Sequence, residues 1–348
     1  MIAHNRPTLG KAEQLAAERT LSSGWVAQGR EVAAFEDEIC EFLNLPKGHA
    51  VAVSSGTAAL FLALWLLKAK GQRVALPVYS CVALLNAVRF AGAEPYFLDC
   101  ESGTPNPVAP AADNADIFIN PWHYGLPSLT RAPANCKMIE DGAHALGAKL
   151  DGAPLGHHGE VAILSFYATK LLTSGGQGGM VVSRDKSLID AARDFREFDE
   201  KADGVARFNI QMTDLQAAIG REQLKQLPKF ITRRSEIFNR YQELPVDWLK
   251  ETSERQEPIR YRAIFRSDEP EKVIRHLKSR GVTAIQPLET RELLAKDTVL
   301  YPVASKLAGG AVSLPIYPTL TDEQCEAVCR AVQECAIAVV PDGATRSK

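Results

Sequence analysis

Residues 51–71 read VAVSSGTAALFLALWLLKAKG, and this stretch indicates the fold more clearly than any other part of the chain. The short β-branched run 51–53 is typical of a strand, and the polar residues after it include a serine that can cap a helix. The apolar run 58–67 continues toward Gly71, where a helix can end. These ten residues fall well short of the ~20 that a membrane-spanning helix needs, so we expect a buried helix.

The rest of the first half repeats this alternation of strand-like and helix-like stretches. Residues 73–79 predict a second strand, and residues 80–92 predict a second helix that is closed by a glycine. Further apolar runs, bounded by Gly, Pro, Asn and Asp, predict strands at 94–100, 115–120 and 136–141. Strands that alternate with helices, and that are apolar throughout, are typical of a parallel sheet covered on both faces. We therefore predict an α/β fold with a mainly parallel central sheet.

The pattern changes after residue 150. Residues 151–156 predict a turn, and an apolar stretch and a glycine-rich loop at 175–179 follow it. Residues 213–245 then predict one long helix. A second unit of alternating strands and helices follows, at 261–267, 269–281, 282–288 and 321–336. We predict a large domain over 1–240 and a smaller C-terminal α+β domain over 241–348, with a frayed end at 342–348.

Composition and charge exclude several classes of protein. The 348 residues carry 40 Lys and Arg against 42 Asp and Glu, which gives a formal net charge of −2. This balance argues against a nucleic-acid or membrane-surface partner. Seven scattered cysteines predict reduced thiols rather than a disulfide framework. The first residues, MIAHNRPTLGKAEQ, lack the pattern of a secretory signal, so we expect a cytoplasmic protein.

The junction between the first strand and the first long helix has the composition of an anion site. Ser55, Gly56 and Thr57 lie where free backbone N–H groups and the helix dipole favour a phosphate. A glycine lets the phosphate approach the backbone, and a threonine adds a hydroxyl donor. Taken alone, the same residues are also typical of an ordinary helix cap.

Two further segments carry chemistry that is weak when each is taken alone. Asp141 lies at the end of a predicted strand, where ligands of open α/β sheets bind, and a carboxylate there can hold a protonated heterocyclic nitrogen. His144 follows three residues later. Lys170 lies between an apolar stretch and a glycine-rich loop, and partial desolvation would favour its neutral, nucleophilic form. Each of these residues could instead be structural.

The three segments together point to one cofactor. Pyridoxal phosphate needs a phosphate cradle, a carboxylate for its pyridine nitrogen and a lysine that forms a Schiff base with its aldehyde. All three occur here in order along a predicted α/β scaffold.

On these residues the sequence resembles the DegT/DnrJ/EryC1/StrS family of sugar aminotransferases, which are fold-type-I pyridoxal phosphate enzymes. The resemblance runs almost from end to end. Its segments are LSSGWVAQGREVAAFEDEICEFLN (21–44), VAVSSGTAALFLAL (51–64), IEDGAHALGA (139–148), SFYATKLLTSGGQGGMVV (165–182), FNIQMTDLQAAIGREQLKQL (208–227) and SLPIYPTLTDEQCEAV (313–328). Any one segment is weakly specific, but the ordered set is highly specific.

The resemblance implies catalytic roles for two of these residues. Lys170 would form the Schiff base with the cofactor and carry the proton between the substrate carbon and the cofactor. Asp141 would hold the pyridine nitrogen protonated, so that the ring withdraws electrons. His144 falls near the position of the cofactor's phenolic oxygen.

The resemblance also implies the remaining cofactor contacts. Gly56, Thr57 and Ser165 would bind the phosphate. Asn209 would reach the phosphate of the partner subunit, so the resemblance implies a homodimer with shared active sites. Cys81 falls at the position over the cofactor ring where relatives carry Trp or Phe.

The chain departs from the family pattern at other positions as well. Gln177 replaces an acidic residue before the paired glycines, and Gln211 replaces an arginine. The segment Trp122, His123, Tyr124 and Gly125 takes the place of a His-Leu-Tyr-Gly stretch, with the histidine shifted by one position. These changes affect the substrate side of the expected site more than the cofactor chemistry.

The function that the resemblance implies is the transfer of an amino group, from glutamate or another donor, to a keto-sugar that is usually nucleotide-linked. The expected mechanism is ping-pong. A pyridoxamine-dependent sugar dehydratase would carry histidine in place of Lys170. A catalytically idle cofactor-binding protein with a regulatory or assembly role, and a transaminase of a cyclitol or other ketone, stay open as alternatives.

Other motifs predict no further site. The loop 175–179 precedes a strand rather than a helix, which argues against a dinucleotide-binding loop. His157 and His158 are adjacent and lack a third ligand nearby, so we expect no metal site. No serine lies in a G-x-S-x-G motif, which argues against an α/β-hydrolase.

Overall fold

The central feature of the fold is a seven-stranded sheet. The computed structural model describes residues 1–111 and 114–339. The strand order is β1-β9-β8-β5-β4-β2-β3. The strands are β1 (Ala50–Val53), β2 (Arg73–Pro77), β3 (Glu94–Leu98), β4 (Ile117–Pro121), β5 (Lys137–Asp141), β8 (Val161–Ser165) and β9 (Gly179–Val182). Only β9 runs antiparallel to its neighbours, so the prediction of a mainly parallel sheet is confirmed.

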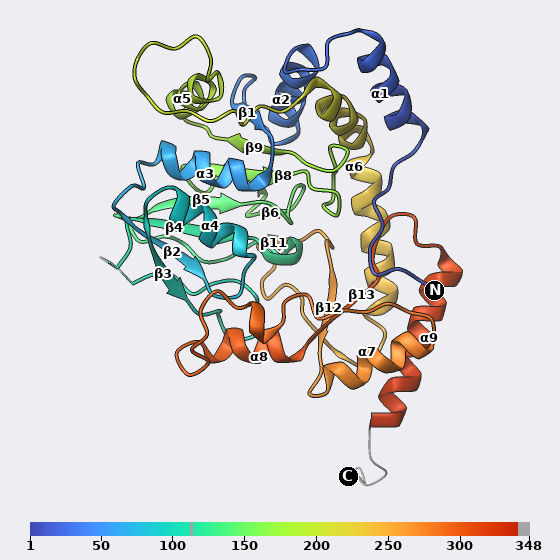
Figure 1. Ribbon diagram of the computed structural model, residues 1–348. Coiled ribbons are helices and arrows are strands. Elements are labelled where there is room, and N and C mark those ends of the chain that lie inside the picture. The colour runs from blue at the N-terminus through green and yellow to red at the C-terminus, as the bar shows by residue number, and fades with distance from the viewer. Residues whose placement is uncertain (112–113, 340–348) are drawn as a thin grey trace.

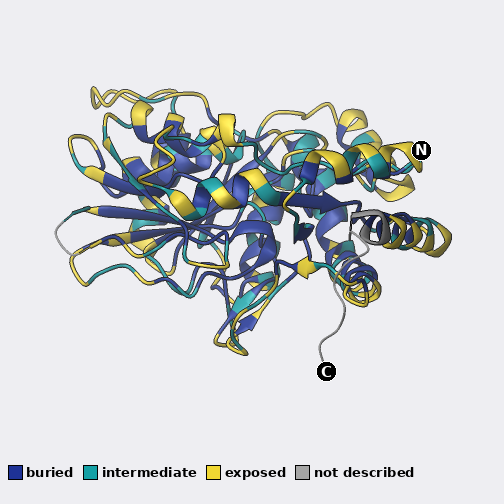
Figure 2. Cartoon of the chain, turned by 90° about the horizontal axis from the view of Figure 1, so that it is seen from below, coloured by how far each residue is buried: buried dark blue, intermediate teal, exposed yellow. Residues whose placement is uncertain are grey.

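Helices cover both faces of this sheet (Figure 1). Side chains alternate across a strand, so Val51 and Val53 contribute to one core, whereas Ala50 and Ala52 contribute to the other. The first core is closed by α3 (Gly56–Leu66), α4 (Val82–Phe90) and α5 (Lys186–Arg196). The second is closed chiefly by α2 (Arg30–Phe42) and α6 (Asp214–Tyr241). Figure 2 shows the strands as the most deeply buried layer.

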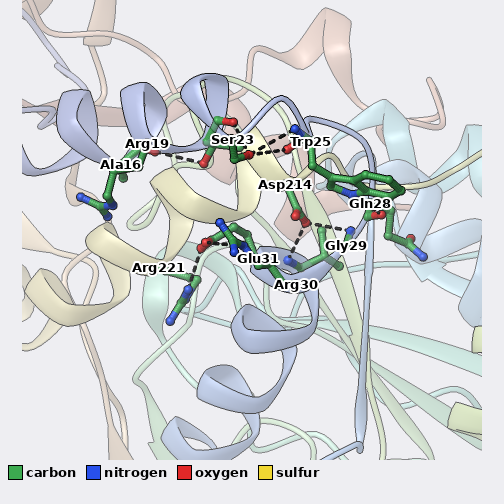
Figure 3. A network of polar contacts seen from close by, with 12 residues as sticks. Ala16, Arg19, Ser23, Trp25, Gln28, Gly29, Arg30, Glu31, Asp214 and Arg221 are labelled. Atoms are coloured by element: carbon green, nitrogen blue, oxygen red, sulfur yellow. Dashed lines mark hydrogen bonds and ion pairs between the residues drawn. The ribbon is translucent and has the colours of Figure 1, made fainter.

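The long helix predicted over 213–245 is present as α6. It begins with a capping box at Thr213 and continues through Pro228 to Tyr241. α1 (Lys11–Ser22) and α2 pack against its first half, and Asp214 fixes their arrangement (Figure 3). The Asp214 carboxylate accepts N–H bonds from Gly29 at 2.8 Å and Val32 at 3.0 Å, and so caps the start of α2.

A second, antiparallel sheet lies toward the C-terminus. Its order is β10-β12-β13, and α7 and α9 share its hydrophobic core. The elements of this region are β10 (Asp247–Trp248), β12 (Ala263–Arg266), α7 (Pro270–Ser279), α8 (Pro302–Gly310), β13 (Ala311–Leu314) and α9 (Asp322–Val339). A small ribbon joins β6 (Lys149–Leu150), β7 (Ala153–Pro154) and β11 (Gln256–Glu257).

One predicted strand is wrong. Residues 282–288 form only isolated bridges, between Ile2 and Val282 and between Ile285 and Ser313. Pro287 lacks the backbone N–H that a longer ladder would need. The sequence pattern also missed α8 and β13, whereas the predicted frayed end at 342–348 lies outside the described residues.

The first residues of the chain lie beside its C-terminal part (Figure 1). Ile2 pairs with Val282, and the His4 ring lies 3.0 Å from the Ser313 hydroxyl. The division at residue 240 stays a proposal, and it falls one residue before the end of α6. No helix in the described part of the chain combines the length and hydrophobicity needed to cross a lipid bilayer.

Candidate active site

A cavity of about 210 Å³ lies where several strands of the large sheet end and α3 and α4 begin. All of the predicted cofactor residues except Asn209 line this cavity: Gly56, Thr57, Cys81, Asp141, His144, Ser165 and Lys170. A cavity of ~150 Å³ already accommodates benzene, so this one has room for a substituted pyridine ring. The position agrees with the rule that ligands of open α/β sheets bind outside the carboxyl ends of the strands.

The start of α3 forms one end of the cavity. The Ser55 hydroxyl accepts the N–H of Ala58 at 3.1 Å, while the N–H groups of Gly56 and Thr57 belong to the first turn, which lacks helical partners. A Cβ on Gly56 would come within 2.8 Å of the Cβ of Ser165, so only glycine permits this close packing. These donors, together with the helix dipole, form an anion site.

Asp141 lines the same cavity and supplies its buried carboxylate. It ends β5 and is only 5% exposed, and its Oδ1 accepts one N–H bond, from Ala143 at 2.9 Å. Burial raises the pKa of Asp141, while the Ala143 N–H and the positive charge of Lys170 act in the opposite direction. A buried carboxylate that lines the cavity, and whose Oδ2 accepts no hydrogen bond from the described residues, is suited to hold a protonated nitrogen.

Lys170 enters the cavity from the loop between β8 and β9. It is half-buried, and its Nζ lies 5.6 Å from the ring centroid of Tyr261. Glycines shape this loop. Gly178 has a φ of +159°, and a Cβ on Gly179 would come within 2.3 Å of the Ser55 carbonyl oxygen. The glycine-rich motif therefore brings the lysine loop against the start of α3.

His144 lies between two tyrosines. Its ring stacks on Tyr261 with centroids 4.2 Å apart, and the Tyr124 ring is nearly parallel at 5.9 Å. Its Nδ1 accepts the Tyr124 N–H at 3.4 Å. Burial and the nearby Lys170 lower the pKa of His144 well below its usual value, so the imidazole is neutral. A neutral imidazole can still donate one hydrogen bond to a bound ligand.

His123 and Ser80 also line the cavity, although the sequence motifs imply no role there for either residue. Each is almost fully buried, and the His123 Nε2 and the Ser80 Oγ have no hydrogen-bond partner among the described residues. Burial lowers the pKa of His123 to about 4, although a hydrogen bond to the backbone of Tyr79 acts against this shift. For His123, the one-position shift of the histidine within the Trp122–Gly125 segment was the only indication in the sequence of a role in the site. No sequence pattern indicated Ser80.

The position expected to cover a cofactor ring has no aromatic side chain. Cys81 is exposed, precedes α4 and lines the cavity. Tyr79, two residues earlier, is 1% exposed, and its hydroxyl hydrogen-bonds that of Tyr124 at 2.7 Å. Tyr79 therefore belongs to the core of the protein and does not replace the missing aromatic group.

Asn209 is the one predicted site residue that lies away from the cavity. Its side chain is exposed and accepts the N–H of Gln211 at 3.2 Å. Gln211 in turn bridges Val53 at the end of β1. This exposed position leaves Asn209 accessible to another molecule.

The residues of the cavity fit pyridoxal phosphate. The free N–H groups of α3 match a phosphate, the buried Asp141 matches a pyridine nitrogen, and Lys170 supplies an amine. The unpartnered Ser80 and His123 atoms provide further polar contacts for a ligand. The described residues contain no group of His, Cys, Asp and Glu that could hold a metal ion, and the cavity needs none for this fit.

Comparisons with known proteins agree with this geometry. The model of the "DegT/DnrJ/EryC1/StrS aminotransferase family" matches residues 7–118 and 130–333. A GDP-perosamine synthase of Escherichia coli O157:H7 is 29% identical over 362 residues, which cover 94% of this chain and 97% of the relative. A dTDP-4-dehydro-2,3,6-trideoxy-D-glucose 4-aminotransferase of Saccharopolyspora spinosa is 34% identical over 276 residues, 71% of each chain.

The fold agrees as well. The crystal structure of the aminotransferase TlmJ from Streptoalloteichus hindustanus superposes with a TM-score of 0.87 at 28% identity, over 97% of this chain and 99% of that one. Pyridoxal phosphate is the cofactor of the family. The chain belongs to the DegT/DnrJ/EryC1/StrS aminotransferase family, and it is a pyridoxal-phosphate-dependent sugar aminotransferase.

Proposed function

We propose that this enzyme transfers the amino group of glutamate to a nucleotide-linked keto-sugar by a ping-pong mechanism. The observation that carries the proposal is the convergence of Lys170, Asp141 and the start of α3 on one cavity. Two relatives, a GDP-perosamine synthase and a dTDP-sugar aminotransferase, support a nucleotide-linked acceptor.

The proposed roles follow from position and charge. Pyridoxal phosphate supplies an aldehyde that takes up the amino group and a ring that withdraws electrons from the bond being broken. Lys170 holds the cofactor through its amine and then moves a proton at the reacting carbon. Asp141 holds the proton on the pyridine nitrogen, because a buried carboxylate favours a cationic partner.

Other residues of the cavity bind and orient the cofactor. Gly56, Thr57 and Ser165 hold its phosphate at the start of α3, where the N–H groups have no helical partner. The neutral His144 donates a hydrogen bond to the phenolic oxygen. Cys81 lines the cavity where the family pattern has an aromatic residue, and its smaller side chain would leave more room beside a bound cofactor.

We also propose a homodimer in which Asn209 reaches the phosphate site of the partner. The exposed position of Asn209 outside its own cavity supports this assignment. The neighbouring Phe208 is 62% exposed, which favours a covering partner at this surface.

The seven cysteines are all free, which supports the proposal of a reducing, cytoplasmic location.

Absorption spectroscopy of the purified enzyme tests the proposed function. Added pyridoxal phosphate should produce the visible band of a lysine-bound cofactor, and glutamate should bleach it to the pyridoxamine form. Lys170→Ala should abolish the band and lower transamination by at least ~10³-fold. Lys149→Ala, at a half-exposed lysine outside the cavity, is the matched control and should behave as the wild type.

Three outcomes would each contradict a different part of the proposed function. A band that forms but never responds to glutamate or to any other amino donor would indicate an idle cofactor-binding protein. Transamination by Lys170→Ala at the wild-type rate would overturn the role of this lysine. Stabilisation of the protein by a free sugar as strong as by its nucleotide-linked form would overturn the proposed acceptor.

A further inference from the structure

Three cationic groups surround the buried ring of Tyr261. Lys170 Nζ lies 5.6 Å from the ring centroid, and the Arg262 guanidinium lies 5.3 Å from it. The positive charge of Arg234 also acts on this phenol. Burial acts to raise the pKa of Tyr261, but these charges, together with a hydrogen bond with Thr169, outweigh it, and the pKa lies below its usual value. Among the described residues, no carboxylate forms an ion pair with any of the three cations.

Two of the three cations already have a task within the fold. Arg234 is 3% exposed, and its Nη1 donates to the carbonyl oxygens of Arg260, Tyr261 and Ile316. It therefore holds the start of β12 against α6. Lys170 belongs to the cofactor site. Arg234 Nε also lacks a partner among the described residues, but that side chain is buried, so Arg262 is the accessible arginine of this cluster with guanidinium donors to spare.

The contacts of Arg262 leave most of its hydrogen-bonding capacity unused. Its Nη1 donates to His4 Nε2 at 3.2 Å, and this is its only hydrogen bond to the described residues. His4 accepts because burial and the nearby Arg262 lower its pKa to about 3, which keeps the imidazole neutral. A guanidinium carries five N–H donors and matches an oxyanion with two parallel bonds.

Arg262 lies near the cofactor site, because the Tyr261 ring that it contacts is also close to Lys170 Nζ. Arg262 precedes β12, and Ile264, two residues later, pairs with Ser313 and contributes to the core of the large sheet. Residues i and i+2 of a strand share a face, which agrees with the contacts of Arg262 to His4 and Tyr261. The charge of Arg262 also acts on His144 and Tyr124, both of which adjoin the cavity. Arg262 itself is half-buried and accessible.

We propose that Arg262 is a specificity-determining residue that binds an oxyanion of a substrate. The proposal rests on the proposed transfer from glutamate to a nucleotide-linked keto-sugar. The cofactor phosphate is not the anion concerned, because that group is assigned to the start of α3, in a cavity that Arg262 does not line. Two substrate groups have the required chemistry, namely a carboxylate of the amino donor and the diphosphate of the acceptor.

Binding of unreactive probes to the cofactor-loaded enzyme distinguishes these two sources. Glutarate carries the carboxylates without an amino group, and GDP and dTDP carry the diphosphate without a sugar. Calorimetry is performed with each probe on the wild type, Arg262→Gln and Arg262→Lys. Arg255→Gln is the matched control, because Arg255 is an exposed arginine that pairs with Asp151 away from the cavity. The visible cofactor band of every variant reports whether the site is intact.

If the donor carboxylate is the ligand, Arg262→Gln should weaken glutarate binding about 10- to 100-fold and leave GDP and dTDP unchanged. It should also raise the glutamate concentration needed for half-maximal conversion, with little change in the limiting rate. If the diphosphate is the ligand, nucleotide binding should fall instead. Arg262→Lys should recover part of the affinity in either case.

The proposal would be overturned if Arg262→Gln bound each of the three probes with the same affinity as the wild type does. A wild type that binds glutarate through Arg262 but never converts its cofactor with glutamate would leave Arg262 as an anion site and overturn glutamate as the amino donor. The two failures are therefore distinguishable.

Discussion

The ring of Tyr261 lies on the imidazole of His144, with centroids 4.2 Å apart and planes inclined by 20°. The two residues are 117 positions apart in the chain, and they join the segment before β12, the central strand of the second sheet, to the segment after β5. Because Lys170 Nζ lies 5.6 Å from the same Tyr261 ring, this tyrosine positions both the histidine and the lysine of the cofactor site.

Removal of the Tyr261 ring should loosen this arrangement. Tyr261→Leu is expected to slow the glutamate half-reaction about tenfold, because a stacked aromatic pair contributes ~0.5–1.5 kcal/mol beyond its buried area. Tyr261→Phe keeps the stacking and should stay within ~3-fold of the wild type. Single-turnover bleaching of the visible cofactor band measures both. Equal rates for the Leu and Phe variants would show that stacking does not position His144.

Cys81 should be the most readily alkylated cysteine. It is exposed at the cavity, whereas five of the other six cysteines are buried and Cys329 is half-buried. Iodoacetamide should therefore modify Cys81 first, and saturating pyridoxal phosphate should slow the reaction at least ~10-fold by occupying the cavity. Peptide mass spectrometry measures the sites and rates, and Cys81→Ser is the control. An alkylation rate of Cys81 that is the same with and without the cofactor would show that Cys81 does not contact the cofactor.

The ion pair between Arg196 and Glu36 should stabilise the large sheet. Both side chains are almost fully buried, and Glu36 also accepts the N–H of Ala52 at 2.8 Å, so the pair joins α5, α2 and β1. Glu36→Leu should cost about 3–5 kcal/mol of unfolding free energy, because it leaves the buried Arg196 without a carboxylate partner, whereas Arg193, which also pairs with Glu36, is more exposed. Arg275→Leu, which removes an exposed pair with Glu271, should change it by less than ~1 kcal/mol. Denaturant unfolding compares them, and similar losses would contradict the expectation.

The burial of His4 predicts a specific pH dependence. Its pKa is lowered from 6.5 to about 3 by burial and by the charge of Arg262, so the folded state stays neutral where the unfolded state takes up a proton. The unfolded state then binds more protons between these values. The stability that His4 contributes is therefore complete above pH 6.5 and is lost as the pH falls toward 3.

The slope from this one group is at most about 1.4 kcal/mol per pH unit. His4→Gln keeps a hydrogen-bonding side chain and removes the titration, so its melting temperature should fall less steeply with pH than that of the wild type. Parallel curves for the two proteins between pH 7 and pH 4 would mean that His4 titrates alike in the folded and unfolded states.

Local patterns in the chain were sufficient for most elements of the large sheet. The strand at 50–53, the capping Ser55 and the apolar helix α3 are adjacent in sequence, so short-range rules predict them. The prediction of a strand at 282–288 was wrong because local composition does not determine strand pairing. Its β-branched composition favours a strand, but Pro287 and the single bridge to β13 leave it without a continuous ladder.

The sequence by itself determined which residues can carry the chemistry. The order of SSGT, Asp141 and Lys170 along an α/β chain indicates a pyridoxal phosphate enzyme, because each segment has a local signature. Tertiary structure alone decided how buried and how charged each group is. Tyr79 is confined to the core, and among the described residues the Nε2 of His123 has no hydrogen-bond partner and Arg262 has no ion pair with a carboxylate. These environments are built by segments far apart in the chain.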